Sequence, residues 1–205
     1  MRKTIEFLFD YGSPNAYLVH RVLPGFVART GAEVTAVPVL LGGLFKLANN
    51  RSPMLAYAEI PHKLAYERLE MKRFIERHGL GGRFRFNPHF PVNTLQVMRG
   101  AVAARRLGCA EAYDEAMFAA MWEQGRKLDD PAEAAAAMTA AGLDAAAIAE
   151  ASQTPEVKAA LLAATEQAHA RGAFGAPSFF VDGELWFGKE RLRDIEERWA
   201  GGVDR

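Results

Sequence analysis

The segments with β-strand character lie only near the two ends of this chain, and this arrangement limits the folds open to it. Residues 4–9 are almost continuously apolar and rich in β-forming side chains, as in a buried strand. A helix over 14–30 and a strand over 33–41 should follow, which predicts two parallel strands with a right-handed crossover. Near the other end, Asp182-Gly183 separates two β-rich runs, a strong hairpin signal, and a last helix is expected over 190–199.

Between these ends the chain is expected to be helical. Helix-forming residues recur at helical spacing over 57–77, 92–107, 110–124 and 130–170. The order of elements predicts an α/β protein in which a small mixed sheet is interrupted by a large all-helical insertion. We assign residues 1–43 and 155–205 to the sheet domain and residues 44–154 to the insertion.

Charge and hydropathy exclude several classes of protein. Lys plus Arg and Asp plus Glu each total 25, so the formal net charge is zero. Binding to nucleic acid or to an anionic membrane depends on a basic excess, which this chain lacks. A net charge near zero favours association, so a homodimer is expected. We find neither a signal peptide nor a run of 18 apolar residues, which predicts a soluble, cytoplasmic protein.

The chain has a single cysteine, Cys109. One cysteine excludes an intramolecular disulfide, a Cys-x-x-Cys redox pair and a zinc site built from several thiolates. The five histidines show no metal-ligand spacing, so no metal site is predicted. For Cys109 itself, a small buried side chain is favoured over a reactive thiol.

Ser13 is the strongest candidate for a functional side chain. It follows the first expected strand and precedes Pro14, as a helix N-cap followed by proline at the first helical position would. Backbone N–H groups and the helix dipole at such a terminus favour an anion. A cap worth about 1 kcal/mol explains the same residue equally well, so Ser13 alone does not decide the function.

Several short motifs along the chain occur together in one known family. They are residues 9–14 (Phe-Asp-Tyr-Gly-Ser-Pro), 41–46 (Leu-Gly-Gly-Leu-Phe-Lys), 50–53 (Asn-Arg-Ser-Pro), 90–95 (Phe-Pro-Val-Asn-Thr-Leu), 174–179 (Phe-Gly-Ala-Pro-Ser-Phe) and 188–192 (Gly-Lys-Glu-Arg-Leu). With these motifs, the chain resembles the 2-hydroxychromene-2-carboxylate isomerases and kappa-class glutathione transferases, which are related to DsbA-like oxidoreductases. The resemblance implies a thioredoxin-like fold with a helical insertion, and a serine where redox relatives carry their first cysteine.

The resemblance also implies a glutathione cofactor. Ser13 would be the catalytic residue, because it would hydrogen-bond the glutathione sulfur and hold it as a thiolate. Ala176 would pair through its backbone with the cysteinyl part, and the peptide bond to Pro177 is expected to be cis. The other expected glutathione contacts are Asn50, Gly188, Lys189 and Glu190, the last three at the γ-glutamyl end.

Two further residues are implied on the substrate side. Lys46 would bind the substrate carboxylate, and Phe86 would line an apolar acceptor pocket. A solvated surface lysine and a core phenylalanine are the alternative interpretations of these two residues. The family commonly has a small polar residue and Asp after the glycine, whereas this chain has Lys189-Glu190.

The implied activity is glutathione-dependent cis-trans isomerisation of an unsaturated aromatic 2-oxo acid. The expected reaction interconverts 2-hydroxychromene-2-carboxylate and trans-o-hydroxybenzylidenepyruvate, with glutathione regenerated. The alternatives are a kappa-class-like glutathione transferase or peroxidase, and a glutathione-binding protein without catalytic activity. The expected partners are therefore a small aromatic substrate, glutathione and a second copy of the chain.

Overall fold

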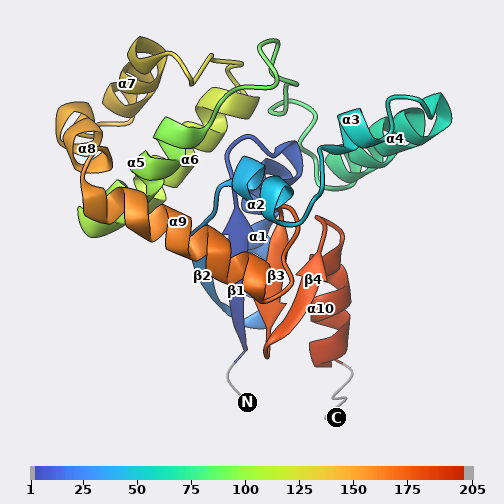
Figure 1. The fold of residues 1–205 in the computed structure, drawn as a ribbon. Helices are drawn as coiled ribbons and strands as arrows, with labels where there is room; N and C mark the ends of the chain where they lie inside the picture. Colours follow the sequence, from blue (N-terminus) through green and yellow to red (C-terminus); the bar gives the residue numbers. More distant parts are fainter. Residues whose placement is uncertain (1–2, 201–205) are drawn as a thin grey trace.

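One mixed sheet of four strands is built from both ends of the chain (Figure 1). The computed structural model describes residues 3–200. The strands are β1 (Thr4–Phe9), β2 (Glu33–Pro38), β3 (Ser178–Val181) and β4 (Glu184–Phe187), and they lie in the order β2-β1-β3-β4. β1 pairs parallel with β2 and antiparallel with β3, and β3 pairs antiparallel with β4. The predicted mixed sheet is confirmed.

The predicted hairpin joins β3 and β4. Asp182 and Gly183 have φ of 51° and 82°, so both central residues are left-handed, as a type I′ turn requires. All four residues of β3 are buried, because this strand lies inside the sheet between β1 and β4.

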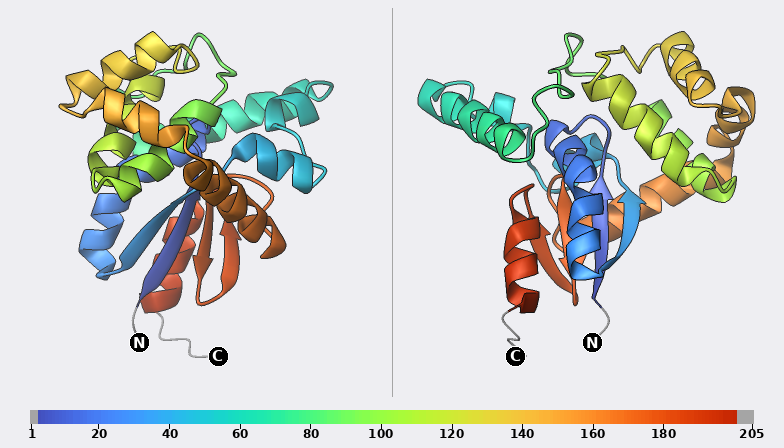
Figure 2. Two further views of the ribbon diagram at one scale, coloured as in Figure 1. Left: turned by 60° about the vertical axis from the view of Figure 1, so that its left-hand side comes forward. Right: turned by 180° about the vertical axis from the view of Figure 1, so that it is seen from behind.

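Side chains of β1 alternate between two cores, one on each face of the sheet. Phe7 and Phe9 belong to the larger core, which includes residues of α1 (Pro14–Thr30) and α10 (Arg191–Ala200). Leu8 belongs to a smaller core on the other face, beneath α9 (Pro155–Ala170). Figure 2 shows α1 and α10 together on one face of the sheet and α9 on the opposite face.

The chain between β2 and β3 is helical in its regular structure. Its helices before α9 are α2 (Leu41–Leu47), α3 (Pro53–Ala56), α4 (Pro61–Arg77), α5 (Leu95–Arg106), α6 (Ala110–Trp122), α7 (Pro131–Ala140) and α8 (Ala145–Ser152). Helices α5 to α8 gather at one end of the sheet, while α3 and α4 project on the other side (Figure 1). Helix α9 contacts α5 and α8 as well as α2 and β2, so the division at 43/44 and 154/155 stays a prediction.

Several expected element boundaries differ in the structure, among them the start of the helix expected over 92–107, which lies at Leu95, and the stretch 130–170, which forms three helices. Two of the differences have a local cause. The second strand ends at Pro38 instead of residue 41, because side chains bind the following backbone N–H groups of Leu40 and Leu41. The helix expected over 57–77 begins at Pro61, where proline occupies the first helical position. No helix of the described residues has both the length and the apolar character needed to cross a bilayer.

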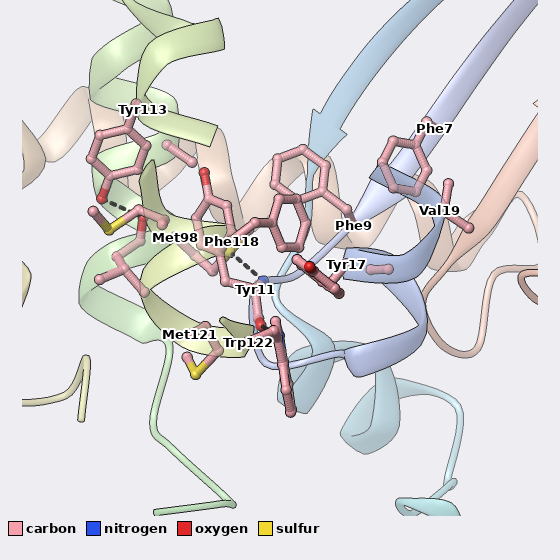
Figure 3. Packing of buried hydrophobic residues seen from close by; sticks show 14 of the residues in the cluster. Phe7, Phe9, Tyr11, Tyr17, Val19, Met98, Tyr113, Phe118, Met121 and Trp122 are labelled. Atoms are coloured by element: carbon pink, nitrogen blue, oxygen red, sulfur yellow. Dashed lines mark hydrogen bonds between the residues drawn. The ribbon is translucent and has the colours of Figure 1, made fainter. Parts of the chain in front are cut away.

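An aromatic cluster joins the sheet to the helical part of the chain. The ring centroids of Phe118 and Phe9 lie 5.6 Å apart, and those of Phe118 and Tyr11 lie 4.9 Å apart. Figure 3 shows these rings between the end of β1 and helix α6, with Trp122 close to Tyr11. The cluster therefore fixes the position of the chain immediately after β1.

Candidate functional site

The loop of residues 10–13, between β1 and α1, is held on several sides. The Tyr11 carbonyl accepts a hydrogen bond of 2.7 Å from Trp122 Nε1, and the Tyr11 N–H lies 3.5 Å from Met98 Sδ. The Ser13 N–H donates to the Asp10 carbonyl at 3.0 Å, which closes a tight turn. These bonds fix the loop that carries the candidate catalytic hydroxyl.

Ser13 caps α1, as its sequence position predicts. Its φ of −93° and ψ of 112° are extended, and its Oγ accepts from the Ala16 N–H at 3.1 Å. The same hydroxyl donates to the Ala176 carbonyl at 2.9 Å, across 163 positions of sequence. The residue is only 4% exposed, and its hydroxyl joins the start of α1 to the loop before β3.

The loop before β3 has the predicted cis bond between Ala176 and Pro177. The Pro177 carbonyl accepts from the Gly188 N–H at 3.1 Å, and Gly188 has a φ of 108° that favours glycine. Ser13, Ala176-Pro177 and Gly188 are thus brought together from three segments of the chain. A second cis bond, between Phe90 and Pro91, was not predicted.

Asn50 lies beside the same loop. Its Nδ2 donates to the Phe174 carbonyl at 3.1 Å, two residues before Ala176, and its Oδ1 accepts from the Arg51 N–H. Lys46 is exposed in the last turn of α2, and its ammonium has no ion pair among residues 3–200.

Lys189 and Glu190 form an ion pair next to Gly188. The Lys189 side chain is 5% exposed, and its ammonium lies 5.6 Å from the ring centroid of Phe74 on α4. A carboxylate oxygen of Glu190 lies 3.2 Å from the position that a Cβ on Gly188 would take. The Lys189 ammonium and the Glu190 carboxylate therefore lie beside Gly188, whose N–H binds the Pro177 carbonyl.

Phe86 is not a core residue, because it is 49% exposed. Its ring contacts Phe90 at 5.2 Å and Trp122 at 5.7 Å between centroids. Since Trp122 binds the Tyr11 carbonyl, Phe86 lies on the outer side of the aromatic cluster that supports the Ser13 loop. A separate cavity of about 380 Å³ between α1, α6 and the β1–β2 edge does not include Ser13.

Two polar residues of the site were missed by sequence reasoning. Asn15, in the first turn of α1, has a buried Oδ1 without a hydrogen-bond partner among the described residues. Asp10 is fully buried, and burial raises the pKa of its carboxyl although three hydrogen bonds oppose the shift. The available signal was an aspartate at the end of an apolar strand, immediately before the Gly-Ser-Pro turn.

Comparison with known proteins places this fold in a defined class. The profile of the DSBA-like thioredoxin domain family matches residues 4–200, nearly the whole chain. A solved structure of 2-hydroxychromene-2-carboxylate isomerase superposes with a TM-score of 0.80 at 23% identity, over 97% of this chain and 95% of that chain. A probable DsbA oxidoreductase from Streptomyces coelicolor superposes with a TM-score of 0.74 at 18% identity, over 100% and 92% of the two chains.

Similarity in sequence narrows the class further. The chain is 30% identical over 196 residues to a 2-hydroxychromene-2-carboxylate isomerase of Sphingobium xenophagum, covering 96% of this chain and 97% of the relative. It is 26% identical over 195 residues to the enzyme of that name from Pseudomonas putida, covering 94% and 92%. The chain therefore belongs, within the DSBA-like thioredoxin domain family, to the 2-hydroxychromene-2-carboxylate isomerases. The thioredoxin-like fold inferred from the motifs is confirmed.

Proposed function

We propose that this protein is a glutathione-dependent isomerase of unsaturated aromatic 2-oxo acids, with 2-hydroxychromene-2-carboxylate as the first substrate to test. One observation carries the proposal. The Ser13 hydroxyl lies at the N-terminus of α1 and is bonded to the carbonyl of Ala176, which precedes a cis proline. The names of the relatives support the choice of substrate.

The residues around Ser13 have the chemistry that glutathione needs. The γ-glutamyl end of the tripeptide carries an ammonium and a carboxylate, and the Lys189–Glu190 pair offers one charge of each sign. The cysteinyl part has backbone polar groups that the Ala176 carbonyl can meet. Asn15, in the first turn of α1, adds a buried amide oxygen that has no partner within residues 3–200.

Ser13 has one proton to donate, and this fixes how it would act. In the structure the proton goes to the Ala176 carbonyl. To stabilise a thiolate, the hydroxyl turns this proton to the sulfur, while Oγ still accepts from the Ala16 N–H. The Ala176 carbonyl then becomes free to accept an N–H of the cysteinyl part, so no buried polar group is left unpaired.

The energy that Ser13 and α1 supply is sufficient to activate a thiol. A free thiol has a pKa of about 8.5, and lowering it by two units takes about 2.7 kcal/mol. A hydrogen bond to a charged group contributes about 1.5–3 kcal/mol, and a helix N-terminus about 0.3–1 kcal/mol. No general base is required beside Ser13.

When bound, glutathione supplies a nucleophilic sulfur that adds reversibly to the unsaturated acid, so that the former double bond can rotate. The chain's own residues orient the acid. Lys46 binds its carboxylate, for which an exposed ammonium without an ion pair is suited. Phe86 and Phe90 provide aromatic surface for its ring.

Glutathione binding and turnover test this proposal. We expect calorimetry to show binding, ultraviolet difference spectra to show thiolate near neutral pH, and 2-hydroxychromene-2-carboxylate to be isomerised at constant glutathione concentration. Consumption of glutathione would favour the transferase or peroxidase, and binding without turnover would favour the non-catalytic protein. Absence of binding at millimolar glutathione would refute the cofactor.

We also propose that two copies associate through α3 and α4. Apolar side chains on this part of the chain are widely exposed: Met54, Leu55, Ile60, Tyr66 and Leu69 range from 41% to 67%. Exposed apolar side chains in this number, on a chain without net charge, favour self-association. We expect sedimentation to give a dimer that Leu55→Asp with Ile60→Asp dissociates, while Leu162→Asp on α9, a residue 58% exposed, leaves it intact. A monomeric wild-type protein would refute the proposal.

A further inference from the structure

Asp10 is a fully buried carboxyl at the end of β1, three residues before Ser13. Its Oδ1 accepts from the Gly12 N–H at 2.8 Å, and its Oδ2 accepts from the Leu41 N–H at 2.8 Å. The Thr94 side chain donates a third hydrogen bond. The three donors come from the Ser13 loop, the start of α2 and the start of α5.

These bonds are specific to a carboxylate. A carboxylate has two acceptor oxygens, whereas an asparagine amide has one acceptor and one donor group. An amide at position 10 would therefore lose the hydrogen bond from either Gly12 or Leu41. Its own NH2 group would then face that backbone N–H, and both groups are donors. The burial that raises the pKa of Asp10 makes this group costly, and the three donors offset that cost.

The packing around Asp10 leaves little freedom. A Cβ on Gly12 would lie 3.2 Å from Thr94 Cγ2 and 3.3 Å from Asp10 Oδ1. Thr94 stands at the N-cap position of α5, yet its side chain does not cap that helix. Its hydroxyl instead bonds to Asp10, so the start of α5 and the Ser13 loop are in direct contact.

We propose that Asp10 is a positioning residue, which fixes the Ser13 hydroxyl relative to α2. The sulfur bound by Ser13 and the substrate carboxylate bound by Lys46 are thereby held at a fixed separation. Contacts of Met98 and Trp122 tie the Ser13 loop to α5 and α6, whereas the carboxylate of Asp10 ties it to α2. Helix α2 carries Lys46 in its last turn and leads to Asn50. The roles of the sulfur and of Lys46 in this inference rest on the proposed function; the tie between loop and helix does not.

Asp10→Asn is the first variant to test, and Thr165→Val is its control. Thr165 Oγ1 accepts from the Leu40 N–H at 2.9 Å, so it anchors α2 one residue away without touching the Ser13 loop. In protein without added glutathione, we expect Asp10→Asn to speed amide hydrogen exchange at Gly12 or Leu41 at least about tenfold. Thr165→Val should speed exchange at Leu40 and leave Gly12 protected.

The second measurement is made with glutathione bound. Asp10→Asn should raise the pKa of the bound thiol and lower kcat for the isomerisation, because the Ser13 hydroxyl no longer points correctly at the sulfur. Thr165→Val should leave that pKa unchanged. Thr94→Val should share the Asp10→Asn effect in part, whereas Thr94→Ser, which keeps the hydroxyl, should restore the wild-type value.

Two results would overturn the proposal. Unchanged exchange at both Gly12 and Leu41 in Asp10→Asn would show that the carboxylate does not hold the loop to α2. A fall in the pKa of the bound thiol would show that Asp10 acts through its negative charge instead. If the wild-type protein fails to bind glutathione, the proposed function is lost, while the exchange data still decide whether Asp10 joins the loop to α2.

Discussion

Replacement of Ser13 by alanine separates the two tasks of this hydroxyl. The variant loses the acceptor for the Ala16 N–H, and loss of such a cap costs about 1 kcal/mol of stability. It also loses the donor that would stabilise the glutathione sulfur. At about 1.5–3 kcal/mol for a hydrogen bond to a charged group, the pKa of the bound thiol should rise by about one to two units. From an activated pKa of about 6.5, the thiolate fraction at pH 7, and with it the isomerisation rate, should then fall about three- to twenty-five-fold.

The assay combines ultraviolet titration of the bound thiol with initial rates as a function of pH. Because the α1 N-terminus remains, the Ser13→Ala variant should regain part of its rate as pH rises through the new thiol pKa. Thr154→Ala is the matched control, since Thr154 caps α9 by accepting from the Val157 N–H at 3.3 Å, in another part of the chain. It should lose similar stability and keep its thiol pKa. A Ser13→Ala protein with wild-type rate and thiol pKa would refute the role of this serine.

Three further substitutions test the substrate end, the γ-glutamyl end and an ion pair remote from Ser13. Lys46→Ala should raise KM for the acid about fivefold and leave the Kd of glutathione unchanged, as steady-state rates and calorimetry would show. Glu190→Gln should raise the Kd of glutathione about fivefold, because it removes the partner of the γ-glutamyl ammonium of glutathione. Calorimetry measures this Kd, and an unchanged value would contradict the contact. Bonds from His20 and Arg21 lower the pKa of Glu115 to about 2, so its stabilisation is present above the ordinary pKa of about 4.5 and is lost as pH falls toward 2. Urea unfolding should therefore show Glu115→Gln to be less stable than wild type near pH 7, with the difference shrinking in acid.

The features that could be predicted from the sequence depend on neighbouring residues. Asp182-Gly183 defines its turn locally, and Ser13-Pro14 defines the start of α1 locally, so both were predicted correctly. The cis bond at Pro177 came from resemblance, because the Ala-Pro pair alone does not reveal it. The positions of Ser13, Ala176 and Gly188 in the family's motifs were sufficient to predict that these three residues lie close together.

The features that could not be predicted depend on contacts between distant segments. The role of Asp10 depends on hydrogen bonds from Leu41 and Thr94, which lie 31 and 84 positions away. No local sequence pattern connects these residues. The burial of the Lys189 side chain likewise involves a contact with Phe74, which belongs to α4. A buried charged group is recognisable only after its donors have been placed around it.

A serine at position 13 also accounts for how this chain can differ from redox members of its family. The N-terminus of a helix lowers the pKa of a cysteine there, which makes that cysteine more reactive toward a second thiol or a disulfide. Here the same terminus carries a hydroxyl, which can form no disulfide and stays a hydrogen-bond donor. The lone Cys109 lies at the N-cap of α6, in another part of the chain. Under the proposed function, the helix terminus then stabilises a sulfur that is not part of the chain, and such a sulfur can enter and leave a reaction unchanged.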